Sequence, residues 1–270
     1  MYRIVLIIGF LGIFCHYASS ENFPTGSRSA GMGNASVTLT DGWSVYHNQA
    51  GLARLEKPWI GFHHENRFII PEYGLQSIGA AIPGKYGTFG IQMSYFGYSQ
   101  YNESIIGLAY AKALGEKVSL GVRLDYFNMF IADNYGNRGT VIGEVGILTQ
   151  PFENFFVGAH LFNPTQSSVA EYDNERVPTI IRIGIGYKFS DKLYVAAETE
   201  KDMEMNPVFK AGIDFMIIEN LFLRTGISTN PTQNTFGLGY KLKRFRADIA
   251  FSTHQVVGLT PHFSLSYEFK

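Results

Sequence analysis

A pair of glycines near the N-terminus has a spacing found in loops that cradle phosphate. Gly31 and Gly33 begin the stretch "GMGNAS", which approximates a G-x-G-x-x-G pattern. In nucleotide-binding proteins this pattern joins a strand to a helix whose N-terminus faces the pyrophosphate. No strand–helix–strand pattern surrounds these glycines, so the sequence disfavours nucleotide binding. We expect them instead to allow a tight bend or close packing against a wall.

Three residues near the C-terminus have the side-chain types of a hydrolase triad. Ser252, His254 and Asp248 fall on one face of a single predicted strand. Alternation alone places polar residues on one face of a strand, and the sequence offers no identifiable oxyanion donor. We therefore predict that the protein is not an enzyme.

The histidines do not have the spacing of a metal site. His63 and His64 are adjacent, so on a strand they point to opposite faces and cannot chelate one ion. His160 and His254 are predicted to face inward as hydrogen-bonded neutral imidazoles, and no H-x-x-x-H or H-E-x-x-H pattern occurs. We predict no metal and no cofactor. Of the two remaining candidates, His47 precedes a predicted turn and His262 begins the last predicted strand. The acidic residues of the loops are predicted to be solvated; they are Asp133, Glu171, Asp173 and Glu175.

The elements that position these residues are predicted to be strands. In 117–130, apolar Val118, Leu120 and Val122 alternate with Arg123 and Asp125 on the other face, which is typical of strands with one polar side. Most segments of this kind are about 9–12 residues long, the length of a tilted strand that crosses a membrane. The predicted strands are 58–69, 74–82, 86–97, 102–113, 117–130, 139–150, 155–163, 178–189, 192–200, 207–218, 220–229, 233–242, 245–254 and 261–270.

The predicted connections alternate between short turns and longer links. This alternation and the even strand number are typical of bacterial outer-membrane barrels, whose tight turns face the periplasm. Aromatic residues recur near the predicted strand ends, as in aromatic girdles. We therefore predict an all-β, antiparallel, up-and-down transmembrane barrel of about 14 strands; the alternative is an exported soluble β-protein. The aromatic residues concerned are Trp59, Tyr86, Tyr126, Phe155, Tyr187, Phe236 and Phe269.

The first twenty residues have the pattern of a secretory signal. Arg3 precedes an apolar run, and small residues end at Ser20, the predicted cleavage site. Cys15 lies in this segment and is the only cysteine, so the processed chain has no disulfide and no cysteine nucleophile. The formal charge of -1 and the lack of a basic cluster exclude nucleic acid as a partner. We divide the chain into a signal (1–20), an N-terminal segment (21–57) and the barrel (58–270).

The N-terminal segment resembles the signature of the FadL superfamily, and within it the PorV/PorQ-type proteins of Bacteroidetes-like bacteria. The stretch "GSRSAGMGNASVTLTDGWSVYHNQAGLARL" carries the match, and "HQVVGLTPHFSLSYEF" is similar to the family's closing strands. The resemblance implies that 21–57 form a hatch inside the lumen, with a short helix at "NQAGLA". Gln49 replaces the family's proline. The matching residues are Arg28, Gly31, Met32, Gly33, Ala35, Asp41, Asn48, Ala50, Gly51, Leu52 and Ala53.

Successive side chains of a strand point to opposite faces, so their position in each predicted strand (the strand parity) also predicts which charged side chains face the lumen. They carry both signs, and mixed charge favours a hydrogen-bonded network that grips a plug over an ion-selective pore, which would show rings of one sign. The predicted lumen residues are Arg123, Asp125, Glu144, Arg182, Lys188, Glu198, Lys210, Asp214, Arg224, Lys241, Arg246, Asp248 and Glu268.

Three functions are open to an outer-membrane protein in contact with lipid, and the resemblance implies the first two. The first is an accessory barrel that binds a type IX-like secretion translocon or a surface protein. The second is a FadL-like channel for hydrophobic small molecules, in which the hatch shifts and the ligand leaves through the wall. The third is a purely structural barrel. The longest loop, "PTQSSVAEYDNERV", is polar and acidic, with Val169 and Tyr172 as its main apolar residues; this favours the first function.

Overall fold

The computed structural model describes residues 24–132, 136–169 and 177–270. The predicted signal (1–20), residues 21–23 of the predicted hatch, and Tyr172 lie outside the described residues. The loop acids Asp133, Glu171, Asp173 and Glu175 lie outside them as well.

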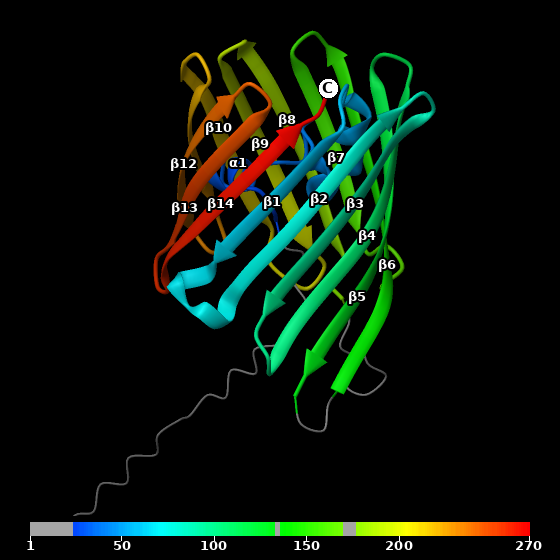
Figure 1. The fold of residues 1–270 in the computed structure, drawn as a ribbon, viewed down its shortest axis with the longest axis vertical. Helices are drawn as coiled ribbons and strands as arrows, with labels where there is room; N and C mark the ends of the chain where they lie inside the picture. The colour runs from blue at the N-terminus through cyan, green and yellow to red at the C-terminus, as the bar shows by residue number, and fades with distance from the viewer. Residues whose placement is uncertain (1–23, 133–135, 170–176) are drawn as a thin grey trace, which may run out of the picture.

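Fourteen antiparallel strands form one closed barrel, in which each strand pairs with its neighbours in sequence and β1 pairs with β14 (Figure 1). This confirms the predicted fold class and strand number. The strands are β1 (Trp59–Asn66), β2 (Gly74–Gly84), β3 (Gly87–Gly97), β4 (Tyr101–Leu114), β5 (Val118–Ile131), β6 (Gly136–Phe152), β7 (Phe155–Phe162), β8 (Ile180–Ser190), β9 (Leu193–Asp202), β10 (Val208–Ile218), β11 (Leu221–Ser228), β12 (Gln233–Leu242), β13 (Phe245–His254) and β14 (Gly258–Glu268).

The first strand is shorter than predicted. It ends at Asn66 rather than at 69, because Phe68 and Ile69 have φ angles of 57° and 60°, which no strand accommodates. Two short 3-10 helices, η2 (Arg67–Ile69) and η3 (Pro71–Tyr73), therefore lead into β2.

The two ends of the barrel differ in the length of their connections. At one end, six turns of two or three residues join the strands, and both chain termini of the barrel lie there; we call this the turn end (top in Figure 1). At the other, the loop end, the connections are generally longer, and the longest spans 163–179. The alternation predicted from the sequence is present in the fold.

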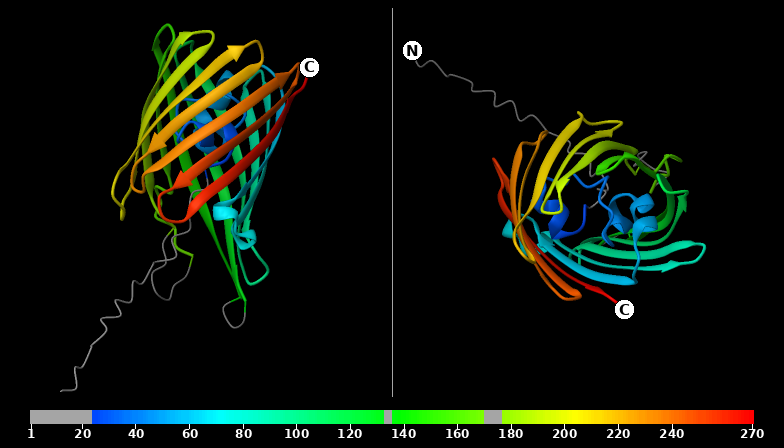
Figure 2. Two further views of the ribbon diagram at one scale, coloured as in Figure 1. Left: turned by 90° about the vertical axis from the view of Figure 1, so that its left-hand side faces the viewer. Right: turned by 90° about the horizontal axis from the view of Figure 1, so that it is seen from above.

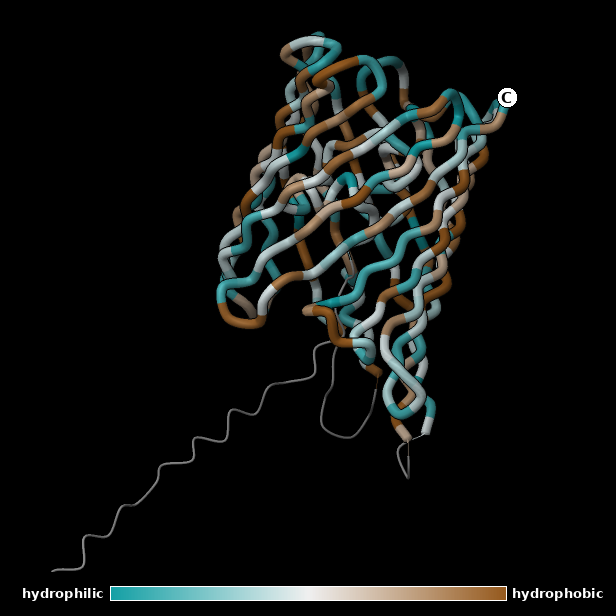
Figure 3. Tube along the Cα trace, turned by 60° about the vertical axis from the view of Figure 1, so that its left-hand side comes forward, coloured by the Kyte–Doolittle hydropathy of each residue, from teal (hydrophilic) through white to brown (hydrophobic). Residues whose placement is uncertain are grey.

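The outer surface of the barrel is apolar. Leu124 on β5 is 65% exposed, whereas its neighbours Arg123 and Asp125 are buried inside. The same alternation of hydrophobic and hydrophilic residues follows the strands around the wall (Figure 3). A closed barrel pairs every strand edge, and together with the apolar exterior this makes a wall suited to hydrocarbon. The fold thus indicates a bacterial outer-membrane protein.

Residues 24–57 lie inside the barrel, as predicted for the N-terminal segment (Figure 2). We call them the inner segment. It contains two short helices, α1 (Ser27–Gly31) and α2 (Ser44–His47), and the 3-10 helix η1 (Gln49–Arg54). None of the described helices is both long and apolar enough to span a membrane. One apolar cluster joins the inner segment to the wall through Trp43, Val45, Tyr46, Leu52, Trp59, Ala81, Ala109 and Ala111.

Candidate functional site

The inner segment binds the wall at a first charged site on β10–β13. Arg28 donates to Asp41 within the inner segment and to Asp214 of β10, both at 2.8 Å. Arg224 pairs with Asp214 at 2.9 Å and with Asp248 at 2.8 Å. Burial alone would raise the pKa of Asp41, but the Arg28 guanidinium outweighs it and holds that pKa below its usual value. The site is therefore a continuous chain of alternating charges that includes the inner segment.

A second site lies on β5–β7 around Glu144, which is fully buried. Its carboxylate accepts from Arg123, from the Gln49 amide at 2.6 Å, and from His160 at 2.9 Å. Arg123 also pairs with Asp125 at 2.9 Å and donates to a carbonyl of the inner segment. Gln49 stands where the resemblance expects proline, and here it supplies an anchor that proline cannot make.

A third site lies on β8–β10. Glu198 accepts from the backbone N–H groups of Ser36 at 2.7 Å and Val37 at 2.8 Å. Lys210 lies 3.1 Å from Glu198 and 2.7 Å from Glu200, which pairs with Arg182 at 2.8 Å. Glu200 is absent from the sequence prediction, although it shares a strand face with Glu198. These hydrogen bonds satisfy buried backbone donors that no secondary structure would otherwise pair.

Three of the predicted lumen residues are not part of these sites. Lys241 and Glu268 form a 3.2 Å ion pair with side chains 37% and 46% exposed, and Lys188 is also exposed. All three lie close to the turn end of their strands, where the inward face meets solvent. The other ten lie in the three charged sites, with Arg246 pairing with Asp248 at 3.1 Å.

Gly31 and Gly33 are in contact with the wall. Gly33 has a φ of 65°, and a Cβ there would lie 2.7 Å from the backbone oxygen of Ile227. The Gly33 N–H donates to the Thr235 hydroxyl at 2.9 Å, and this hydroxyl donates to the Gly31 carbonyl at 3.0 Å. The wall thus accepts from the Gly33 N–H, a donor that a phosphate would need. Both glycines lie close against the wall.

The rest of the matching motif lies in the lumen and, except for the partly buried Ala53, is buried there. Met32 and Ala35 pack against Ala196 of β9. The Asn48 amide donates to the Val37 carbonyl at 2.8 Å and to the Ile147 carbonyl of β6 at 3.1 Å. The last four motif residues, Ala50, Gly51, Leu52 and Ala53, belong to η1.

Burial lowers the pKa of His47 to about 4, so this imidazole is neutral at pH 7. Its Nε2–H donates to the Thr25 carbonyl at 2.6 Å. The histidine just before η1 thus has a structural partner within the inner segment.

The triad considered from the sequence is not assembled. Ser252 lies 3.0 Å from His262 rather than from His254, and Asp248 is engaged by Arg224 and Arg246. His254 accepts from the backbone of its own turn. The absence of catalysis remains a prediction.

The structure also brings together side chains that the sequence analysis kept apart. His63 and His64 do point to opposite faces, but β1–β14 pairing places Glu65 opposite His262. His63, Glu65 and His262 consequently form one buried group. Only the rule that first and last strands meet in a closed barrel could have revealed it.

The inside of the loop end is largely apolar on one side, where the buried Glu103 of β4 is the charged exception. There the inward side chains of β2 and β4–β8 form an apolar cluster, which we call the apolar mouth. The long connection contributes Val169 and Val177 to it, so a loop predicted to be mainly polar turns apolar residues inward. The cluster comprises Leu75, Ile105, Phe127, Met129, Ile142, Phe162, Val169, Val177 and Ile180. The opposite half is polar and includes Glu65, Ser228, Thr260 and His262.

Two hollows accompany these sites. One, of about 140 Å³, lies at the turn end beside Arg28, Lys188 and Asp214. The other, of about 530 Å³, is an apolar depression lined by outward-facing residues such as Phe215 and Phe236 of β10–β13. The second therefore faces the bilayer rather than the lumen.

Comparison with solved structures shows the fold. A monoaromatic hydrocarbon channel, CymD, matches with a TM-score of 0.71 at 15% identity over 91% of this chain and 97% of that chain. The chain has the fold of this channel. The P. putida toluene transporter TodX matches with a TM-score of 0.64 at 12% identity, over 90% of this chain and 98% of that chain. A Pseudomonas aeruginosa FadL homologue matches with a TM-score of 0.61 at 12% identity, over 92% and 99%. No protein-family profile and no curated protein matches the sequence.

Proposed function

We propose that the protein is an outer-membrane channel for neutral hydrophobic small molecules, with the inner segment as its hatch. The observation that carries this proposal is the apolar mouth. The channels whose fold the chain shares include one named for monoaromatic hydrocarbons and one named for toluene. This reverses the order in which the sequence placed the two main functions.

Along the same strands, the lining of the lumen changes from apolar at the loop end to charged beside the inner segment. On β5, the inward residues are Phe127 and Met129 at the loop end, followed by Asp125 and Arg123 beside the inner segment. A pore for polar solutes would be hydrated over its whole length, whereas a hydrophobic site presents apolar walls with few polar groups. To pass, an uncharged hydrophobic compound must part the packed side chains of the mouth, which are at most 9% exposed, and then displace the inner segment.

The secretion-partner function stays as the second candidate because the inner segment is anchored to the wall at three charged sites. A barrel that only presents its surface to a translocon needs no passage, and firm anchoring fits that role. The PorV/PorQ relationship and a type IX translocon remain predictions from the resemblance.

Placing a carboxylate in the apolar mouth tests the proposal. In proteoliposomes that take up a radiolabelled monoaromatic hydrocarbon, Ile142→Asp is expected to reduce the protein-dependent flux at least about tenfold, since about 1.4 kcal/mol of lost binding gives that factor. Ile142 is fully buried. Ile142→Leu keeps volume and polarity, and Ser228→Asp places the same charge in the polar half.

The two control variants should transport like the wild type, and heat-modifiable migration on gels should show that all three variants fold. Equal flux through folded Ile142→Asp and the wild type would refute the role of the mouth. Wild-type flux no higher than that of empty vesicles would refute transport and leave the secretion-partner function.

A further inference from the structure

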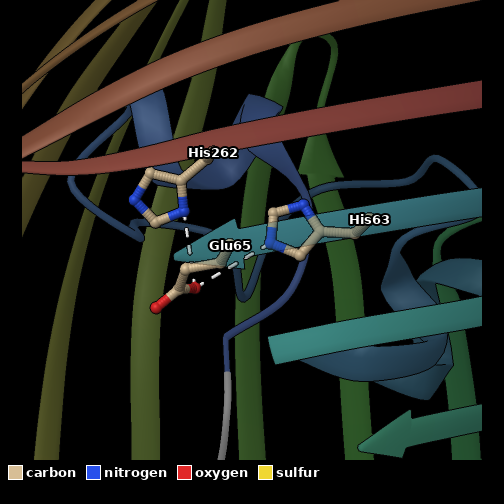
Figure 4. A group of neighbouring side chains, drawn as sticks. All are labelled: His63, Glu65 and His262. Atoms are coloured by element: carbon tan, nitrogen blue, oxygen red, sulfur yellow. Dashed lines mark ion pairs between the residues drawn. The ribbon is translucent and has the colours of Figure 1, made fainter. Parts of the chain in front are cut away.

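A group of two histidines and one glutamate lies at the seam where the barrel closes. His63 and Glu65 come from β1, and His262 comes from β14 (Figure 4). The Glu65 Oε2 atom lies 3.4 Å from His262 Nδ1 and 3.8 Å from His63 Nε2. All three side chains are buried, and one candidate ligand atom from each lies within 4.8 Å of the others.

The two imidazole nitrogens that face Glu65 are not satisfied by hydrogen bonds. Among the described residues, neither His63 Nε2 nor His262 Nδ1 has a hydrogen-bond partner, and the side chains are only 1% and 7% exposed. An unsatisfied buried polar group costs about 1–3 kcal/mol. Ligands held about 2.0–2.2 Å from one tetrahedral ion are separated by about 3.3–3.6 Å, close to the 3.4 and 3.8 Å between Glu65 and the two imidazoles.

In each of the three side chains, the polar atom that does not face the group has a hydrogen-bond partner of its own. His63 Nδ1 lies 2.9 Å from the Ser264 hydroxyl, and His262 Nε2 lies 3.0 Å from the Ser252 hydroxyl. Arg67 donates to Glu65 Oε1 at 2.7 Å and leaves Oε2 directed at the imidazoles. Such outer contacts fix the tautomer and the orientation of metal ligands.

We propose that His63, Glu65 and His262 bind a divalent transition-metal ion of the zinc class. Two imidazoles and one carboxylate suit zinc, whereas calcium and magnesium require oxygen ligands. Arg67 neutralises the single carboxylate, so the site has less negative charge than a site with an unpaired glutamate, and its affinity is correspondingly moderate.

The bound ion also acts on the hatch. The Ser264 hydroxyl that orients His63 accepts from the Ser27 N–H at 2.8 Å and lies 2.9 Å from the Ser27 hydroxyl at the start of α1. An ion that fixes His63 therefore stiffens both the β1–β14 seam and the first attachment of the inner segment.

Titration with Zn²⁺ and Co²⁺ tests the site, using the processed, untagged protein in detergent after chelation and desalting. We expect one ion per chain, and ligand-field absorption of tetrahedral Co²⁺. The ligand variants His63→Gln, His262→Gln and Glu65→Gln should each lose more affinity than Ser264→Ala, for which a loss of about 10–100-fold is expected. His64→Gln is the matched control, because His64 lies on the same strand and faces outward.

Heat-modifiable migration must show that each variant folds. Wild-type protein that binds no stoichiometric ion would overturn the proposal and leave a metal-free hydrogen-bonded cluster. Binding that persists unchanged in folded His63→Gln and His262→Gln would place the ion elsewhere and overturn it equally. Neither outcome bears on hydrocarbon transport, which the flux measurements test separately.

Discussion

Replacing Glu144 with alanine is expected to lower the free energy of unfolding by about 3–5 kcal/mol, because it leaves buried polar partners uncompensated. Arg123, Gln49 and His160 all donate to this one carboxylate. Since Gln49 belongs to the inner segment, the same change should loosen the hatch. Urea unfolding in detergent measures the first effect.

Tryptophan fluorescence measures the second effect, because the chain has two tryptophans and both lie in the apolar cluster that joins the inner segment to the wall. Trp43 of the inner segment and Trp59 of β1 are buried, with ring centroids 4.9 Å apart. A quencher added to Glu144→Ala under native conditions should reach them more readily than in the wild type.

Lys241→Ala provides the matched control. Its ion pair with Glu268 joins β12 to β14 across β13 but is exposed at the turn end, and exposed pairs contribute at most about 1 kcal/mol. If Glu144→Ala and Lys241→Ala destabilised the protein equally, the buried site would not anchor the inner segment.

Deleting residues 24–57, with residue 23 joined to Pro58 so that residues 21–23 still follow the predicted signal, is expected to convert a closed barrel into an open pore. The β1–β14 ladder that closes the wall runs from Trp59 to Glu65 and contains no residue of the inner segment. Barrels of 16–18 strands leave an aqueous channel while 8 strands fill their own interior, and here the lumen needs a separate segment to fill it. The charged side chains left behind would be hydrated.

Planar-bilayer recordings measure this change. The wild type should show no stable conductance, and the deletion variant should show discrete, long-lived open steps. Heat-modifiable migration controls for folding. A folded deletion variant that stays closed would mean that the side chains of the wall, rather than the inner segment, block the lumen.

Most of the barrel could be predicted because its signal is local. Alternation along 117–130 predicts β5 to within a residue at each end, since every second side chain meets lipid. The end of β1 could not be predicted in this way: Phe68 and Ile69 are strong strand formers, and only their backbone conformation at the loop end breaks the strand.

The lumen was predicted less completely because its contacts are long-range. Parity identified Arg123, Glu144 and Asp214 as inward, but nothing local indicated that Gln49 would pair with Glu144. The alternation of inward and outward side chains also continues to the turn end of each strand. It therefore placed Lys241 and Glu268 in the lumen, although solvent reaches them. The His63–Glu65–His262 group combines the first and last strands, and no spacing within the sequence joins residues so far apart.

Simultaneous measurement of hydrocarbon flux and ionic current through the wild-type protein tests the central claim most directly. In vesicles and planar bilayers made from one preparation, a closed hatch beneath an apolar mouth predicts protein-dependent flux of a neutral monoaromatic compound without steady ionic conductance. Steady ionic conductance with no hydrocarbon flux above that of protein-free vesicles would contradict it.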